Sequence, residues 1–336
     1  MNILYLCLGI LVFTLIILDI IKTALSSSGG GRVTNAVTKG VWKVFFLMAG
    51  KSGTSKLLSY SGPAILVSIL LTWVLGLWSG LFLVLLSDPG SVVNSKTLVS
   101  AGPLEKLYYA GFTLSTLGMG DYKASSDAWR LVTSAAAFCG FASLTLSITY
   151  FVPVLSAVGL QSTLSLYISG MGKTPQQMLA NGWNGKDFSS FFGKTSNLCQ
   201  MLMQHTMNHH SYPVIHYFHN SKPGRAAIPA IVQLYEAHRL LRYRVPQGAV
   251  KDDTGIEMLQ TALDTYLDVL KGTVKGHLPK QQAPTTDVRQ LQEKGVPLRN
   301  AEETSQSQSP DKRHRQMMLS SLLEMDGWSW QEVYSS

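Results

Sequence analysis

Two glycines separated by a single residue, Gly118 and Gly120, stand between Thr116 and Asp121. Glycine adopts left-handed backbone conformations without steric cost, so a chain that alternates between right- and left-handed residues can turn successive carbonyl oxygens to one side. A column of such oxygens replaces the water around a dehydrated cation. The Thr116 hydroxyl would extend the column at one end, and the Asp121 carboxylate would add negative field at the other. The pattern therefore predicts a cation-binding segment made mainly of backbone.

The residues before this segment predict a short helix over 104–115, with Thr113 and Ser115 in its last turn as supporting hydroxyls. The carbonyl end of a helix carries partial negative charge, which favours a cation beside it. One loop cannot surround an ion, so four copies would have to meet on an axis. An ordinary glycine turn is the alternative interpretation, because such turns are common.

The elements that would hold this segment are membrane spans. Hydrophobic residues make up 46% of the 336 residues and charged residues only 14%, which excludes an ordinary soluble protein. Three apolar blocks, 3–21, 64–86 and 128–158, reach the roughly 20 residues that a bilayer requires. A cleaved signal peptide is the alternative for the first block, but its positive charges follow the apolar run instead of preceding it.

Basic residues predict the orientation. The connection between the first two spans contains no acidic residue and five basic ones, Arg32, Lys39, Lys43, Lys51 and Lys56. Positive charge accumulates on the cytoplasmic side, so the N-terminus is expected outside and the C-terminal half in the cytoplasm. Residues 33–48 predict a helix along the membrane surface or, alternatively, a solvated loop. We expect an integral protein of the plasma or inner membrane, in contact with lipid.

The segment from Thr113 to Asp121, T-L-S-T-L-G-M-G-D, resembles the signature of the potassium-channel superfamily, whose core is T-V-G-Y-G followed by Asp. The matching residues are Thr116, Gly118, Gly120 and Asp121. Leu117 is a conservative replacement, whereas Met119 replaces the usual tyrosine or phenylalanine. The resemblance implies a homotetramer that conducts K+ passively and uses no cofactor other than the permeant ions.

The resemblance also implies the site. The ion-binding residues would be Thr116, Leu117, Gly118, Met119 and Gly120, supported by Thr113, Ser115 and Asp121. Gly140 falls where such channels have a hinge in the inner helix, although close helix packing explains a small residue there equally well. The helical period from Gly140 assigns Phe141, Leu144, Ile148 and Val152 to the pore wall. No span carries arginine at every third position, so a voltage sensor is not expected.

The predicted fold is an all-α membrane protein with three transmembrane helices, a re-entrant pore helix and filter, and a mainly helical cytoplasmic domain. The expected parts are an N-terminal transmembrane helix (1–25), a basic interfacial segment (26–62), the pore domain (63–158), a cytoplasmic helical domain (159–279), a disordered linker (280–312) and a C-terminal amphipathic segment (313–336). In the helical domain, Thr174 followed by Pro175 predicts a helix start. Apolar residues at helical spacing over 228–241 and 256–270 predict two packed helices. The last segment is either a docking helix or a frayed tail.

A cluster of possible metal ligands lies in the helical domain, at Cys199, His205, His209, His210, His216 and His219. Metal sensing or pH sensing is conceivable, but the spacing matches no familiar metal site, so none is assigned. No nucleophile and base stand at a recognisable spacing, which indicates that the chain is not an enzyme and has no catalytic residues. No basic patch with interleaved aromatic residues indicates nucleic acid as a partner.

Two alternatives to selective K+ conduction remain open. Met119 removes the ring packing behind the filter while it retains every carbonyl, so a weakly selective K+/Na+ channel is the first. The second belongs to another class, a membrane-anchored sensor or scaffold whose helical domain binds a metal or a partner. Neither the gating stimulus nor a regulatory ligand is indicated by the residues.

Overall fold

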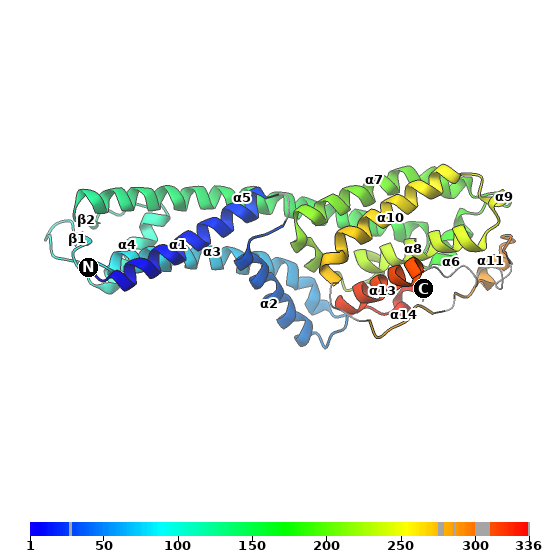
Figure 1. Ribbon diagram of the computed structural model, residues 1–336, viewed down its shortest axis with the longest axis horizontal. Coiled ribbons are helices and arrows are strands. Elements are labelled where there is room, and N and C mark those ends of the chain that lie inside the picture. The colour runs from blue at the N-terminus through cyan, green and yellow to red at the C-terminus, as the bar shows by residue number, and fades with distance from the viewer. Residues whose placement is uncertain (27–28, 275–278, 285, 300–309, 335–336) are drawn as a thin grey trace. The chain divides into compact units, whose positions relative to one another are not determined.

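The computed structural model describes residues 1–26, 29–274, 279–284, 286–299 and 310–334. It divides into two compact units. The membrane unit comprises Met1–Trp42 and Pro63–Val154, and the helical unit comprises Lys43–Gly62 and Leu155–Ser336. Figure 1 shows the helices of both units, which are almost the whole of the secondary structure.

Three helices are long and apolar enough to cross a membrane, as predicted: α1 (Ile3–Leu25), α3 (Ser61–Leu86, preceded by the turn η1, Lys56–Tyr60) and α5 (Asp127–Met171). The third of these, α5, continues to Met171 as one helix of 45 residues. The boundary predicted at residue 158 therefore lies within a helix. Pro153 is also inside α5, which runs through it without ending.

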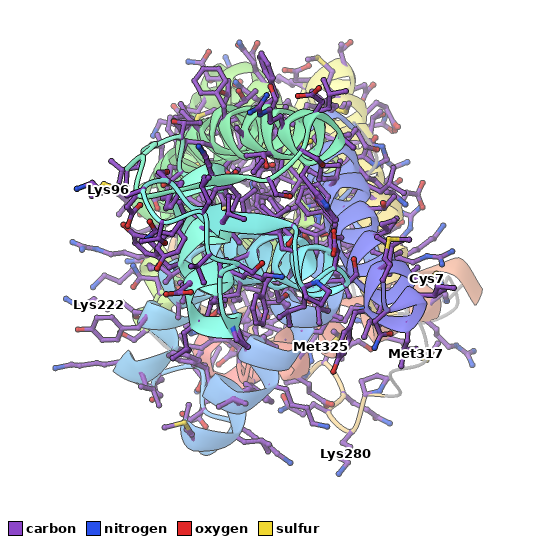
Figure 2. The ribbon with its side chains drawn as sticks, turned by 90° about the vertical axis from the view of Figure 1, so that its left-hand side faces the viewer. Cys7, Lys96, Lys222, Lys280, Met317 and Met325 are labelled. Carbon is purple, nitrogen blue, oxygen red and sulfur yellow. The ribbon has the colours of Figure 1, made fainter. Side chains whose placement is uncertain are left out.

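Glycines let α1 and α3 lie close together in antiparallel directions. A methyl group at Gly9 would stand 2.7 Å from the Val84 backbone nitrogen, and one at Gly76 would stand 2.7 Å from the Ile16 side chain. Both distances are too short for real carbon contacts. Apolar lipid gives helices no hydrophobic reason to associate, so spans rely on small residues that allow backbones to approach. Cys7 is exposed on the opposite, outer side of α1 (Figure 2).

The one charged residue in the first predicted span, Asp19, holds the start of α2 (Arg32–Met48). Its carboxylate accepts hydrogen bonds from the backbone N–H groups of Val33 (2.8 Å) and Thr34 (3.1 Å), and from Trp73 Nε1 of α3 (3.2 Å). The first N–H groups of a helix have no partner within the helix, and a carboxylate satisfies them well. The segment predicted as a helix or a loop is thus a helix, and Asp19 joins it to two spans.

A short helix, α4 (Pro103–Leu114), lies between α3 and α5 where the re-entrant helix was predicted. Trp78 Nε1 of α3 donates to the Leu107 carbonyl oxygen (2.8 Å), and the Tyr109 hydroxyl donates to Thr133 Oγ1 of α5 (3.0 Å). Two strands that the sequence did not indicate, β1 (Val92–Asn94) and β2 (Tyr122–Ala124), pair in antiparallel register on either side of α4 in the chain.

The helical unit is built on one continuous apolar core. Its elements are α6 (Pro175–Gly182), α7 (Ser189–Ser211), η2 (Pro213–Tyr217), η3 (Pro223–Arg225), α8 (Ala227–Arg244), α9 (Gln247–Val250), α10 (Asp253–Val274), α11 (Arg289–Glu293), α13 (Pro310–Met325) and α14 (Trp330–Tyr334). The predicted helix start is confirmed, because Thr174 accepts a hydrogen bond from the Gln177 N–H. The apolar residues that predicted α8 and α10 are buried.

The last part of the chain is packed onto the unit. Leu319, Leu322 and Trp328 are buried, so a docking helix is the correct interpretation and a frayed tail is wrong. Figure 2 marks α13 by its residues Met317 and Met325. In the segment predicted as a disordered linker (280–312), the described residues include one short helix, α11, and residues 285 and 300–309 lie outside the described part. Leu291 and Val296, two of the few apolar residues in this segment, are buried in the core of the helical unit.

Gly31→Ala should destabilise the junction of α1, α2 and α3, because a methyl group at position 31 would overlap the Asp19 carboxylate. We expect a loss of about 1–3 kcal/mol, typical of overpacking, visible as a lower midpoint in thermal unfolding of the full chain. Gly40→Ala, within α2, is the control, because a methyl group there meets nothing within 4 Å. Alanine favours helix over glycine, so this control should be neutral or stabilising. Equal midpoints for the two variants would contradict the role given to Asp19.

Candidate functional site

The predicted cation-binding segment begins at the end of α4. The Leu117 N–H donates to the Phe112 carbonyl oxygen (2.9 Å), and the Thr116 N–H donates to the Thr113 carbonyl oxygen (3.1 Å). These two bonds form a Schellman motif, which ends a helix through a residue in the left-handed conformation. Thr116 occupies that position with a φ of 57°. A β-branched residue is strained there, and nothing in the sequence indicated it.

Left-handed residues alternate along 116–120. Gly118 has a φ of 60° and Gly120 a φ of 80°, whereas Leu117 and Met119 do not have positive φ. The left-handed conformation predicted for both glycines is confirmed. With Thr116 included, every second residue of the segment is left-handed, which is the backbone pattern that a column of carbonyl oxygens requires.

The segment has little packing within one chain. Residues 115–121 are all exposed, and within the described structure a methyl group built at Gly118 or Gly120 would meet nothing beyond its chain neighbours within 4 Å. The side chains of Leu117 and Met119 are 66% and 57% exposed. Irregular backbone between two spans is tolerated only where protein buries it or where it lines water. A single copy of the chain supplies neither environment in full.

The C-terminal end of the segment is tied back to α4. The Tyr122 hydroxyl donates to Glu105 Oε1 (2.5 Å), and Glu105 Oε2 accepts from the Gly102 N–H (2.6 Å). The Asp121 carboxylate accepts a hydrogen bond from the Tyr122 N–H (3.1 Å). Sequence reasoning identified Asp121 but missed Tyr122 and Glu105. Glu105, three residues after the N-cap residue Gly102, fits the pattern of a capping box and was the one available signal.

The two predicted supporting hydroxyls lie in the last turn of α4 and just after it. Ser115 Oγ donates to the Phe112 carbonyl oxygen (3.2 Å). Thr113 is buried, and its hydroxyl has no hydrogen-bond partner among the described residues. A buried hydroxyl normally finds a partner, so Thr113 is a further sign that a single chain leaves this region incomplete.

A lysine buried in α4, which the sequence did not single out, fixes the other end of the helix. Lys106 is 2% exposed, and its ammonium donates to the carbonyl oxygens of Leu85 (3.0 Å) and Asp88 (2.6 Å). The Asp88 carboxylate in turn accepts from Trp129 Nε1 of α5 (2.8 Å). A cation at the carbonyl end of α3 satisfies backbone oxygens that the helix leaves free. Lys106 thereby joins α3, α4 and α5.

Gly140 is placed by packing. A methyl group at position 140 would stand 2.8 Å from the carbonyl carbon of Leu114 and still closer to its oxygen, so α5 reaches the end of α4 only through glycine. The two explanations offered for this glycine were a hinge and close helix contact. The contact is present, and α5 is continuous through Gly140.

The predicted pore-wall residues share one exposed face of α5. Phe141, Leu144, Ile148 and Val152 are 56–62% exposed. A cavity of about 460 Å³ between α3, the end of α4 and α5 is lined by Thr116, Gly140, Phe141 and Leu144, among others. The structure thus brings Thr116, at the start of the segment, together with Phe141 and Leu144 of this face. Ile148 and Val152 lie outside the cavity.

Three histidines of the predicted cluster are buried. His205, His209 and His216 are at most 8% exposed, with ring centroids 6.4 Å apart for the first pair and 5.6 Å for the second. Among the residues that the structure describes, no group of three or more His, Cys, Asp or Glu side chains is arranged to hold a metal ion. His216 Nε2 instead lies 3.3 Å from Asp326 Oδ1 at the end of α13, a contact that the sequence did not indicate.

Burial shifts the titration of this cluster. It lowers the pKa of His205 and of His216 to about 4 and raises the pKa of Asp326 to about 7. The histidines are therefore neutral at pH 7, and the group that titrates near neutrality is a carboxyl. The hypothesis that these histidines sense neutral pH does not fit their burial.

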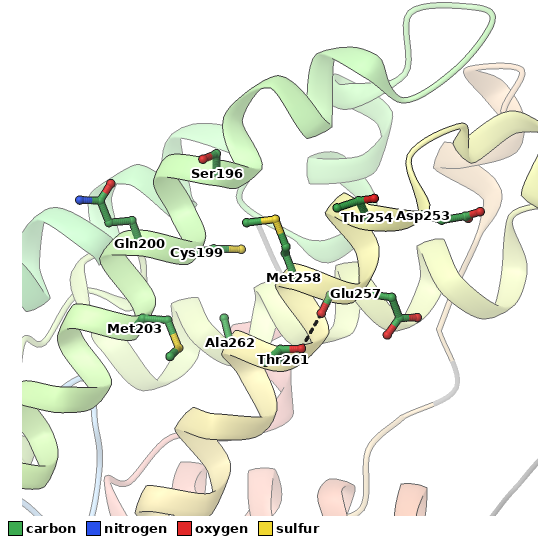
Figure 3. A pocket seen from close by; sticks show the side chains of 10 residues that line it. All are labelled: Ser196, Cys199, Gln200, Met203, Asp253, Thr254, Glu257, Met258, Thr261 and Ala262. Carbon is green, nitrogen blue, oxygen red and sulfur yellow. Dashed lines mark hydrogen bonds between the residues drawn. The ribbon is translucent and has the colours of Figure 1, made fainter.

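Cys199 belongs to a different part of the helical unit. It lines an open groove of about 750 Å³ between α7 and α10, together with Met203 and Met258 (Figure 3). Asp253 and Glu257 add the only charges to the lining residues. The groove contains no histidine, so the Cys199–His219 stretch of the sequence does not converge on one site.

Comparisons with known proteins agree with this geometry. A family described as "Ion channel" matches residues 68–157, which run from α3 through α4 and the 116–121 segment into α5. An uncharacterized membrane protein of Bacillus subtilis (strain 168), YdjJ, is 29% identical over 316 residues, which cover 94% of this chain and 92% of that protein. No solved structure matches the chain.

Gly140→Ala should force α5 away from the end of α4 and lower the thermal stability of the full chain by about 1–3 kcal/mol, the usual cost of overpacking. Gly159→Ala, also in α5, is the matched control because its methyl group would meet nothing within 4 Å. Thermal unfolding in the same detergent measures both. A Gly140→Ala chain as stable as the control would show that the close approach to Leu114 is not required.

Asp326→Asn should change the pH dependence of stability. The folded-state pKa of Asp326, about 7, lies above its ordinary value of 3.8, so stability falls as pH rises through this window. His205 and His216 have lowered folded-state pKa values, so their effect on stability has the opposite sign, and it is present in the wild type and in the variant. Between pH 6.5 and 8 the free energy of unfolding of the wild type should therefore fall by up to about 1 kcal/mol relative to that of the variant.

The measurement for Asp326→Asn is the thermal midpoint followed by tryptophan fluorescence at both pH values. Asp268→Asn, which replaces an exposed aspartate of α10, should behave as the wild type. Parallel behaviour of the wild type and Asp326→Asn would show that Asp326 does not titrate in this range.

Proposed function

We propose that this chain, whose residues 68–157 match the family described as "Ion channel", assembles as a homotetramer that conducts K+ passively across the membrane. The observation that carries the proposal is the exposed, alternating backbone of residues 116–120 at the carbonyl end of α4. Four such segments around an axis would supply both the packing that a single chain lacks and the oxygens that a dehydrated ion needs.

The residues in this proposal have distinct roles. Carbonyl oxygens of residues 116–120 replace the hydration shell of the ion, and the Thr116 hydroxyl completes the inner end. The carbonyl end of α4 makes the cavity below favourable for a cation. The apolar face of α5, including Ile148 and Val152, forms the lower wall, where close approach of four copies stops flow by dewetting.

Selectivity depends on how firmly the outer end of the filter is held, because Met119 contributes no aromatic packing there. Tyr122 and Glu105 support a selective filter, since their 2.5 Å hydrogen bond ties the chain just after Asp121 to α4. The weakly selective K+/Na+ channel is the alternative if this support is insufficient. By charge distribution, the N-terminus lies outside and the helical unit in the cytoplasm of a plasma or inner membrane.

Vesicles that contain the purified full chain should show K+ flux, and Gly118→Ala should reduce it by at least about ten-fold, because a side chain at a left-handed position costs about 1 kcal/mol in each of four copies. Gly185→Ala is the matched control. Gly185 also has positive φ (93°) and open space, but it lies in the helical unit. Equal flux through both variants would contradict the assignment of the ion filter to residues 116–120.

The same vesicles decide between the two kinds of channel. With K+ on one side and Na+ on the other, a selective filter gives a reversal potential near the K+ equilibrium value. A potential near zero would favour the weakly selective alternative. Absence of flux from wild-type protein that is folded and tetrameric would contradict the channel proposal and favour the sensor or scaffold.

A further inference from the structure

The C-terminal part of α2 and the connection that follows it carry cations without a counter-charge. Between Asp19 and Asp88 the sequence contains no acidic residue. Lys43, Lys51 and Lys56 are exposed, and none of them forms an ion pair with the part of the chain that the structure describes. A cluster of this kind attracts an anionic surface.

Apolar side chains are exposed on the same stretch. Val44, Leu47 and Met48 are 54%, 55% and 68% exposed, and their spacing places them on one face of α2. Lys43 borders this face at the helix surface, and Lys51 and Lys56 follow in the connection. We call these six residues the basic interfacial surface: Lys43, Val44, Leu47, Met48, Lys51 and Lys56. All of them belong to the helical unit.

The start of α2 is fixed beside the membrane spans. Asp19 of α1 accepts hydrogen bonds from Val33 and Thr34 at the beginning of α2, and the same carboxylate accepts from Trp73 of α3. Both α1 and α3 are long and apolar enough to span a membrane, so α2 begins beside two candidate spans.

We propose that the basic interfacial surface binds the acidic phospholipid headgroups of the bilayer. A bilayer interface offers negative headgroups beside an apolar layer, which matches lysines beside exposed valine, leucine and methionine. A nucleic acid would match the lysines but not the apolar face. The proposal depends on insertion into a membrane and not on ion conduction, so vesicles that show no flux leave it unaffected.

The experiment uses the full chain in vesicles that contain trace spin-labelled phosphatidylglycerol or, in parallel, spin-labelled phosphatidylcholine. Electron paramagnetic resonance reports the motionally restricted fraction of each lipid, and hence the association of the acidic lipid relative to the zwitterionic one. We expect this ratio to exceed one for the wild type and to fall at least about two-fold in Lys43→Gln/Lys51→Gln/Lys56→Gln. Salt at about 1 M should lower the wild-type ratio as well, because it screens the attraction.

Three other exposed lysines of the helical unit provide the matched control. Lys186→Gln/Lys194→Gln/Lys294→Gln removes the same charge and should leave the ratio unchanged. Equal ratios for the two triple variants would overturn the proposal, and so would a wild-type ratio of one. A ratio that does not respond to salt would also overturn it, and this measurement needs no variant to fold. A wild-type ratio of one with binding of an acidic soluble protein would assign the surface to that class of partner.

Discussion

Backbone N–H and C=O groups find no hydrogen-bond partner in lipid, and this constraint determines how the membrane unit is built. The three spans satisfy their own groups by being helical. The polar side chains that remain in the unit largely complete helix ends: Asp19 accepts from the start of α2, and Lys106 donates to the end of α3. Residues 116–121, by contrast, keep an irregular and exposed backbone in the described structure, and the proposed assembly around ions would cover it.

Close contacts between helices determine where that segment lies. Gly9 and Gly76 let α1 approach α3, and Gly140 lets α5 approach the end of α4 at Leu114. Trp73 stacks on Phe151 of α5 with ring planes 4° apart, while its indole nitrogen donates to Asp19. Trp73 therefore connects the Asp19 carboxylate, at the start of α2, with Phe151 of α5. These helix contacts position the irregular backbone of residues 116–120. The only strands in the described part of the unit are the short pair β1 and β2.

The sequence predicted what periodicity and length determine, and it missed what depends on contacts across the chain. Three spans, the re-entrant helix and the left-handed glycines followed from apolar blocks and from residue type. Thr116 in the left-handed region could not be predicted, because threonine rarely adopts it and only the Schellman bonds at the end of α4 impose it. Tyr122 with Glu105, and His216 with Asp326, are pairs separated by 17 and 110 residues, for which one sequence carries no signal. The roles of residues 116–121 and of the α5 face remain predictions.

A three-dimensional density map of the full chain in a lipid bilayer with K+ tests the central claim most directly. The account predicts a fourfold axis with the backbone of residues 116–120 from four copies around it and density for ions along it. A map in which these residues lie away from every symmetry axis, or in which the chain is a folded monomer, would contradict the account.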